Sequence, residues 1–165
     1  MGSKGSSLGP GRVLLQGGLV VAVLDAIDAF VFFGLYLKGV TPTRIFQSIA
    51  GGLLGRAAFR GGLATALLGL VLHFFNATVI VCVYYFASRK VVALTRHPVL
   101  CGLLYGPLVH LFMYFVVVPL SAAGRSPNTV PVLLNGLLGH ALLVGLPSAL
   151  FARAASAAAS SSVSP

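Results

Sequence analysis

The amino-acid sequence predicts an all-α, polytopic membrane protein: a four-helix transmembrane bundle with a short interfacial amphipathic helix. Of its 165 residues, 58% are hydrophobic and 8% are charged, and the mean hydropathy is +1.00, whereas soluble domains carry roughly 25% charged residues. The sequence also contains four apolar runs that each reach the length of about 20 residues that a span requires. These runs and their connections nearly exhaust the chain, so we expect a single transmembrane domain over residues 13–152.

The first apolar run covers residues 13–37. It follows a Gly- and Ser-rich stretch at residues 1–12, which we expect to be a flexible N-terminal tail. The run is too long for the core of a signal peptide and has no small-residue cleavage site nearby, so we interpret it as a retained span. It also holds the only two acidic residues of the chain, Asp25 and Asp28. Ionisable groups inside a span are costly and are functional candidates by default.

The segment from about residue 42 to residue 60 predicts an amphipathic helix in the membrane interface. Thr41 can cap this helix and Pro42 suits its first position. Apolar residues then recur at helical spacing, namely Ile45, Phe46, Ile49, Leu53 and Ala57, and the polar residues fall mostly elsewhere around the helix. A short re-entrant segment is the alternative, because Gly51, Gly52 and Gly55 would permit it.

The other three spans are expected at about residues 62–87, 99–120 and 130–151. Tyr84 and Tyr85 near the end of the second span, followed by Arg89 and Lys90, indicate an aromatic belt backed by positive charge. Pro98 is a natural start for the third span. The Ala- and Ser-rich stretch at residues 153–165 predicts a disordered C-terminal tail.

The net charge of +9 reflects topology rather than nucleic-acid binding. All eleven basic residues lie at or between the ends of the apolar runs, where they mark orientation and contact anionic lipids, so the lipid bilayer is the expected partner and nucleic acid is not. If both termini lie on the same side of the membrane, six of the basic residues lie on that side and five on the other. We expect both termini in the cytoplasm, because Arg12, Arg89 and Lys90 directly adjoin span ends.

Every span carries a polar residue at similar depth. The first has Asp25 and Asp28, and the other three have His73 and Asn76, His110, and His140. Asp25 and Asp28 share one helix face, as do His73 and Asn76. Small residues line the same stripes, which predicts close helix packing and inward-facing polar groups; these residues are Gly62, Ala66, Gly69, Gly102, Gly106 and Gly136. The pattern predicts a polar layer near the membrane midplane.

The two carboxylates need partners. The first span has about fifteen Val, Leu, Ile and Phe residues, worth roughly 5 to 9 kcal/mol for insertion, while two central Asp residues cost roughly 5 to 7 kcal/mol. Insertion of this span into the membrane becomes clearly favourable if one Asp is protonated, or if the pair faces a protonated His or a cation. The two carboxylates, one helical turn apart, are expected to exchange protons as a coupled pair.

Carboxylates beside histidines suit proton transfer or cation coordination, because histidine titrates near neutrality. We therefore predict a small transporter, channel or proton-linked factor that uses Asp25 and Asp28 as exchangeable sites. A chain of 165 residues would form a homo-oligomer to build a sizeable pathway. The alternative is a structural or assembly protein whose polar layer only fixes helix packing, through interhelical hydrogen bonds of about 0.6 kcal/mol each.

Other chemistry at the same residues is less well supported by the sequence. Imidazole and carboxylate groups accept zinc, manganese or iron, and two histidines on facing helices can ligate a haem. No dense ligand motif is present, so we expect no cofactor and leave a metal open. An enzyme is not expected, because Ser88 and Ser121 at span ends have no obvious base beside them.

Three short stretches between Phe46 and Pro119 carry a family resemblance: Gln47 to Ala50, Leu72 to Phe74, and Tyr84 to Arg89. Through them the chain resembles a group of small bacterial inner-membrane proteins of uncharacterised function. The resemblance covers most of the chain outside the two tails. It implies four spans and a bacterial cytoplasmic membrane, and it brings no activity or site residue with it.

Overall fold

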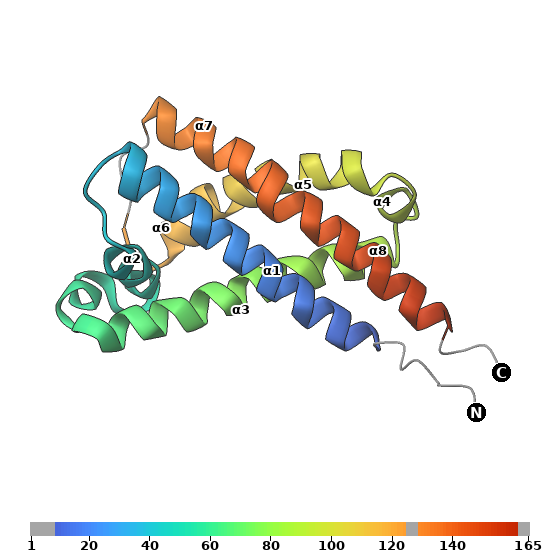
Figure 1. The fold of residues 1–165 in the computed structure, drawn as a ribbon, viewed down its shortest axis with the longest axis horizontal. Helices are drawn as coiled ribbons and strands as arrows, with labels where there is room; N and C mark the ends of the chain where they lie inside the picture. Colours follow the sequence, from blue (N-terminus) through green and yellow to red (C-terminus); the bar gives the residue numbers. More distant parts are fainter. Residues whose placement is uncertain (1–8, 125–128, 162–165) are drawn as a thin grey trace.

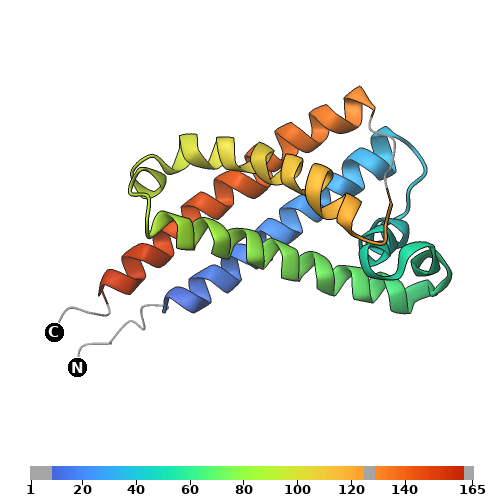
Figure 2. The same ribbon diagram turned by 180° about the vertical axis from the view of Figure 1, so that it is seen from behind.

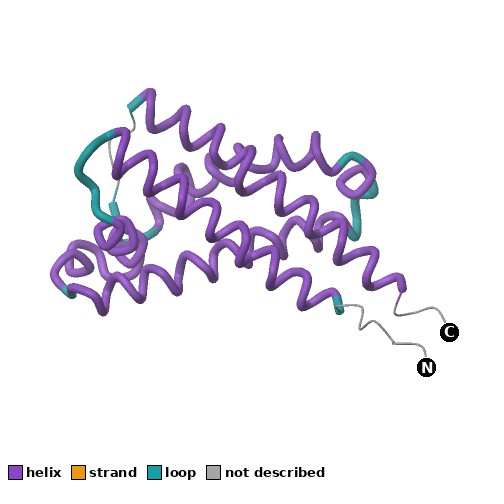
Figure 3. The backbone as a smooth tube through the Cα atoms, in the orientation of Figure 1, coloured by secondary structure: helices purple, strands orange, loops and turns teal. Residues whose placement is uncertain are grey.

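The computed structural model describes residues 9–124 and 129–161. Every regular element within these ranges is a helix (Figure 3). Four helices are long and apolar enough to cross a membrane: Pro10–Tyr36, Gly62–Ser88, Pro98–Leu120 and Val130–Ser160. The predicted all-α class with four potential spans is therefore confirmed.

Three of the four spans combine α-helical and π-helical segments. The first consists of α1 (Pro10–Ala29) and η1 (Phe30–Tyr36), and the second is the single helix α3 (Gly62–Ser88). The third consists of α5 (Pro98–Phe112), η3 (Met113–Val117) and α6 (Val118–Leu120). The fourth consists of α7 (Val130–Gly139), η4 (His140–Gly145) and α8 (Leu146–Ser161). The connections contain α2 (Pro42–Leu54), the 3₁₀ helix η2 (Gly55–Arg60) and the short α4 (Ala93–Arg96).

The long helices run side by side along the long axis of the molecule (Figures 1 and 2). One end holds the start of α1, the end of α8 and α4, and we call it the terminal end. The opposite end holds α2 and η2, together with the end of η1 and the start of α7, and we call it the α2 end. Both ends of the described chain therefore lie on the same side of the bundle, as the four-span prediction requires.

Helix α2 lies across the α2 end and is seen nearly end-on in Figure 1. The Thr41 hydroxyl oxygen accepts a hydrogen bond from the backbone N–H of Arg44 at 3.3 Å, and Pro42 follows, so the predicted cap is confirmed. The buried Gln47 side chain donates to the carbonyl of Gly62 at 3.0 Å and fastens α2 to the start of α3. A crosswise orientation favours the interfacial helix over the re-entrant alternative.

The apolar core lies toward the terminal end, where α1, α3 and α8 meet. Its members are mostly small or β-branched, which lets the helices approach closely: Leu14, Val21, Ala22, Ala77, Val81, Tyr84, Tyr85, Val144, Ala149, Ala152 and Ala155. The predicted aromatic belt is wrong for Tyr84 and Tyr85, which are 1% and 9% exposed and belong to this core. The Tyr84 hydroxyl donates a hydrogen bond to the carbonyl of Leu94 at 3.0 Å. Tyr84 thus fixes α4 to the bundle.

Glycines allow direct backbone contact between the third and fourth spans. A Cβ at Gly102 would lie 2.8 Å from the Cα of Leu146, and a Cβ at Gly106 would overlap the carbonyl of His140. A Cβ at Gly145 would in turn meet the backbone of Gly102 and Gly106. The predicted stripe at Gly102 and Gly106 therefore does bring two spans together, whereas Gly69 contacts the backbone of Phe46 in α2 instead of a span.

The fourth span is longer than the sequence predicts. Helix α8 continues to Ser161, so the expected disordered tail from residue 153 is wrong for residues 153–161; residues 162–165, like the N-terminal residues 1–8, lie outside the described ranges. The physical reason is packing: Ala152 and Ala155 are fully buried in the core beside α1. In the N-terminal tail, Pro10 already begins α1. Small side chains and the high helix propensity of alanine thus extend α8.

This packing predicts that Ala155→Asp destabilises the protein by about 3 kcal/mol or more, because it places an unpaired charge in the core. Ala154→Asp is the matched control, since Ala154 is exposed on the same turn of α8. Thermal unfolding in maltoside micelles, followed by circular dichroism, measures both variants. Equal midpoints for the two variants would show that α8 does not pack against α1 beyond Arg153.

Candidate functional site

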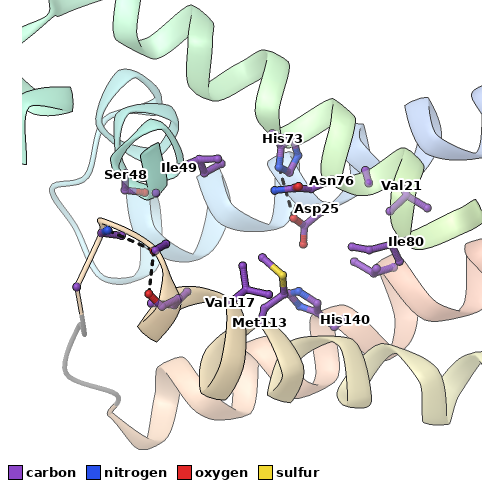
Figure 4. A pocket seen from close by; sticks show the side chains of 17 residues that line it. Val21, Asp25, Ser48, Ile49, His73, Asn76, Ile80, Met113, Val117 and His140 are labelled. Atoms are coloured by element: carbon purple, nitrogen blue, oxygen red, sulfur yellow. Dashed lines mark hydrogen bonds and ion pairs between the residues drawn. The ribbon is translucent and has the colours of Figure 1, made fainter. Parts of the chain in front are cut away.

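A cavity of about 390 Å³ opens at the α2 end and reaches the middle of the bundle (Figure 4). All four spans and α2 contribute to its wall. Its exposed mouth includes Ser48 of α2 and the turn residues Ala123 and Gly124. Its floor includes Val21, Ala77 and Val144, which are at most 3% exposed and belong to the apolar core. The cavity is therefore accessible from one end and closed by packed side chains at the other.

Four of the six predicted polar residues line this cavity: Asp25, His73, Asn76 and His140. Figure 4 shows Asp25, His73 and Asn76 together on one wall, with His140, Met113 and Val117 facing them. The four residues come from α1, α3 and the start of η4. Four residues of the predicted polar layer therefore do lie together, but they line a cavity with largely apolar walls instead of bonding only to one another.

Asp25 and His73 form the centre of the polar wall. His73 Nε2 donates a hydrogen bond to the carbonyl of Ala22 at 2.8 Å, which leaves Nδ1 facing the Asp25 carboxylate at 4.0 Å. A carbonyl only accepts, so a neutral His73 must carry its hydrogen on Nε2 and present a lone pair at Nδ1. Asp25 and Nδ1 can therefore each accept a proton, and the ion pair exists only when His73 is protonated.

Asp28 has a different partner from Asp25 and does not line the cavity. It accepts a hydrogen bond of 2.8 Å from the side-chain amide of Asn135 in α7, close to Gly139. Asn135 is not among the residues predicted from the sequence. Its signal was nevertheless present, because a lone amide in an apolar run is as unusual as Asn76 in the second span. The two carboxylates therefore contact two different helices instead of acting on one shared partner.

His110 and His140 lie against each other where the third and fourth spans meet. Their ring centroids are 4.8 Å apart with an interplanar angle of 65°. A Cβ at Gly136 would overlap the His110 ring, so this glycine makes room for it. His110 Nε2 is buried and has no hydrogen-bond partner within the described chain. His140 borders the cavity and His110 lies behind it.

The charge of the cavity is opposite to that of the chain as a whole. The sequence has a net charge of +9, yet the described residues of the wall include neither Lys nor Arg. Asp25 is the one carboxylate among them, and its side chain is 28% exposed. The site therefore favours a positively charged occupant or a proton.

The geometry gives little support to a metal or a haem. Within residues 9–124 and 129–161, no group of three or more His, Cys, Asp or Glu side chains is placed to hold a metal ion. A haem with two axial histidines needs its plane between the two imidazoles. The rings of His110 and His140 are in contact, which leaves no space for that plane.

Comparison with known proteins adds no further assignment. No protein-family model, curated protein or solved structure matches this chain.

Proposed function

We propose that this protein takes up a proton or a small cation through the cavity at the α2 end and uses Asp25 as the exchangeable site in a transport process. The observation that carries the proposal is the position of Asp25 on the wall of a one-sided cavity, with His73 Nδ1 4.0 Å away. In this proposal a proton passes between the two groups through a bridging water, because each can accept it but 4.0 Å exceeds hydrogen-bond distance. The cavity supplies the route by which water and ions reach them.

The contrast between the two carboxylates supports this role. A carboxylate that only fastens helices should have a direct partner, as Asp28 has in Asn135 at 2.8 Å. Asp25 faces His73 at 4.0 Å, beyond hydrogen-bond distance, and is partly exposed to the cavity. We therefore assign packing to Asp28 and exchange to Asp25, so that the structural alternative applies to one residue and the transport prediction to the other.

A non-catalytic role fits the hydroxyl groups of the wall. Ser48 donates to the carbonyl of Ile45 at 2.6 Å, and Ser121 donates to that of Val118 at 2.8 Å. Both protons are therefore engaged by backbone carbonyls three residues earlier, which favours a local structural role over nucleophilic attack. We retain the proposal that the protein is not an enzyme.

The proposed location is a bacterial cytoplasmic membrane with both termini in the cytoplasm. Arg12, Arg89 and Lys90 flank the terminal end of the bundle, which supports this orientation. The cavity would then open on the opposite face of the membrane. A homo-oligomer remains part of the proposal, because the cavity of a single chain is closed at one end.

Replacement of Asp25 by Asn is expected to reduce proton flux in proteoliposomes by at least about tenfold, equivalent to roughly 1.4 kcal/mol. The variant keeps the size of the side chain but removes the proton-accepting carboxylate. Flux is measured with a pH-sensitive dye inside the vesicles after an external pH jump. Asp28→Asn makes the same chemical change one turn away, outside the cavity, and should retain flux within about twofold of the wild type.

Each variant must match the wild type in helicity and in elution from a gel-filtration column. Unchanged flux in a correctly folded Asp25→Asn variant would refute the transport proposal. Equal losses in both variants would show that the two carboxylates act together and that their different surroundings do not separate their roles.

A further inference from the structure

The electrostatics of the cavity select for positive charge. Asp25 is partly exposed inside a largely apolar wall, and the described wall residues contain no Lys or Arg that could neutralise it. Because the surroundings have a low dielectric constant, a cation near this carboxylate is attracted more strongly than it would be in water. Anions gain no comparable partner there.

The apolar part of the wall disfavours a bare inorganic ion. Ile49, Ile80, Met113, Val117 and Val118 line most of the space around the polar residues. A hard cation needs about six oxygen ligands or retained waters, and these side chains supply none. A hydrocarbon group fits them well, and the flexible thioether of Met113 can adapt to its shape.

The size of the cavity limits the occupant to a small molecule. Its volume of about 390 Å³ lies near the lower end of the range of roughly 300–1,000 Å³ for ligand sites. The polar wall places the amide of Asn76 beside Asp25, where its oxygen can accept a second hydrogen bond from the same ligand. A group with several N–H donors and one positive charge matches this pair of acceptors.

We propose that the cavity binds a small organic ammonium ion, with its N–H groups toward Asp25 and Asn76 and its hydrocarbon part against Met113, Val117 and Ile49. The inference rests on the proposed function, in which Asp25 is the exchangeable site of this cavity. The ammonium group can belong to a free amine or to the headgroup of an aminophospholipid. In either case the organic cation and a proton compete for the Asp25 carboxylate.

The test uses the full-length protein in uncharged maltoside micelles and benzylammonium as the probe, with binding measured by titration calorimetry. We expect saturable binding to the wild type and at least about tenfold weaker binding to Asp25→Asn, or roughly 1.4 kcal/mol. Asp28→Asn should bind as the wild type does. Benzyl alcohol, which has the same ring without the charge, and Na⁺ should both fail to compete.

Three results would overturn the ammonium site: equal affinity in the wild type and Asp25→Asn, equal competition by benzyl alcohol, or equal competition by Na⁺. Competition by added phosphatidylethanolamine but not by phosphatidylglycerol would identify the lipid headgroup as a source of the ammonium group. Without such competition, a free amine is the source.

The test separates this inference from the proposed function. Proton flux that depends on Asp25, without benzylammonium binding, would reject the ligand and retain the function. Saturable binding that depends on Asp25, without flux, would reject the function and retain the ligand.

Discussion

A cysteine at position 76 is expected to react with a membrane-impermeant maleimide that is added from one side of the membrane only. Asn76 lies near the middle of α3 and lines the cavity. The cavity opens at the α2 end and is closed by Val21, Ala77 and Val144 on the side of the terminal end. The reagent needs water to reach the thiolate. Near-complete labelling from the α2 side and none from the terminal side is the predicted outcome.

The two native cysteines, Cys82 and Cys101, are free thiols and must first be replaced by Ala. Two positions on the same helix serve as controls. Val79 is 41% exposed on the outer surface, where lipid should exclude the reagent, and Val81 is fully buried in the core. Neither Val79→Cys nor Val81→Cys should be labelled from either side.

Labelling of Asn76→Cys from both sides would show an open channel in place of a one-sided cavity, and protection from both sides would show that the cavity is dry. In right-side-out vesicles, reaction with external reagent also tests the proposed orientation. Termini in the cytoplasm place the mouth of the cavity on the outer face.

Substitution of Gly106 by Ala is expected to destabilise the bundle by about 3 kcal/mol or more, because overpacking against backbone cannot be relieved by a change of rotamer. The added Cβ would overlap the carbonyl of His140 and lie 2.6 Å from the Cα of Ala141. The third and fourth spans must then separate. Since His140 borders the cavity, the same change should also weaken the cavity wall.

Stability is measured by titration with SDS in mixed micelles, with helicity as the readout. Gly51→Ala is the matched control, since nothing lies within 4 Å of the position that its Cβ would occupy. The Gly51→Ala variant should be as stable as the wild type or up to about 1 kcal/mol more stable, because alanine has a higher helix propensity than glycine. Similar losses of stability in Gly106→Ala and Gly51→Ala would mean that the close approach of the two spans at Gly106 does not restrict the residue there to glycine.

The sequence predicts the spans well because insertion into a bilayer depends on length and hydropathy, which are local properties. It also places the polar groups at one depth, and four of them do meet at the cavity. Helix rotation is harder to predict. Residues three positions apart point about 60° apart around an α-helix, and that angle is enough for Asp25 to face α3 while Asp28 reaches Asn135 in α7.

Composition also misleads at the C-terminal end. An Ala- and Ser-rich stretch resembles a disordered segment, but the same small side chains allow α8 to pack closely against α1, with Ala155 fully buried. The π-helical segments η1, η3 and η4 had no sequence signal at all. Each begins within three residues of Asp28, His110 or His140, which is the placement often found for π-helical turns at functional sites.

The floor of the cavity has a consequence for how a passage through the bundle could be controlled. Val21, Ala77 and Val144 offer no hydrogen-bonding side chain, and each is almost fully buried. Narrow apolar constrictions can act as gates by dewetting, since water is unstable in them. In the proposed transport, the barrier at this point would be the cost of separating and hydrating packed apolar side chains. These three side chains are the first of the apolar core, which continues to Ala155 at the terminal end, and opening it breaks no ion pair among them.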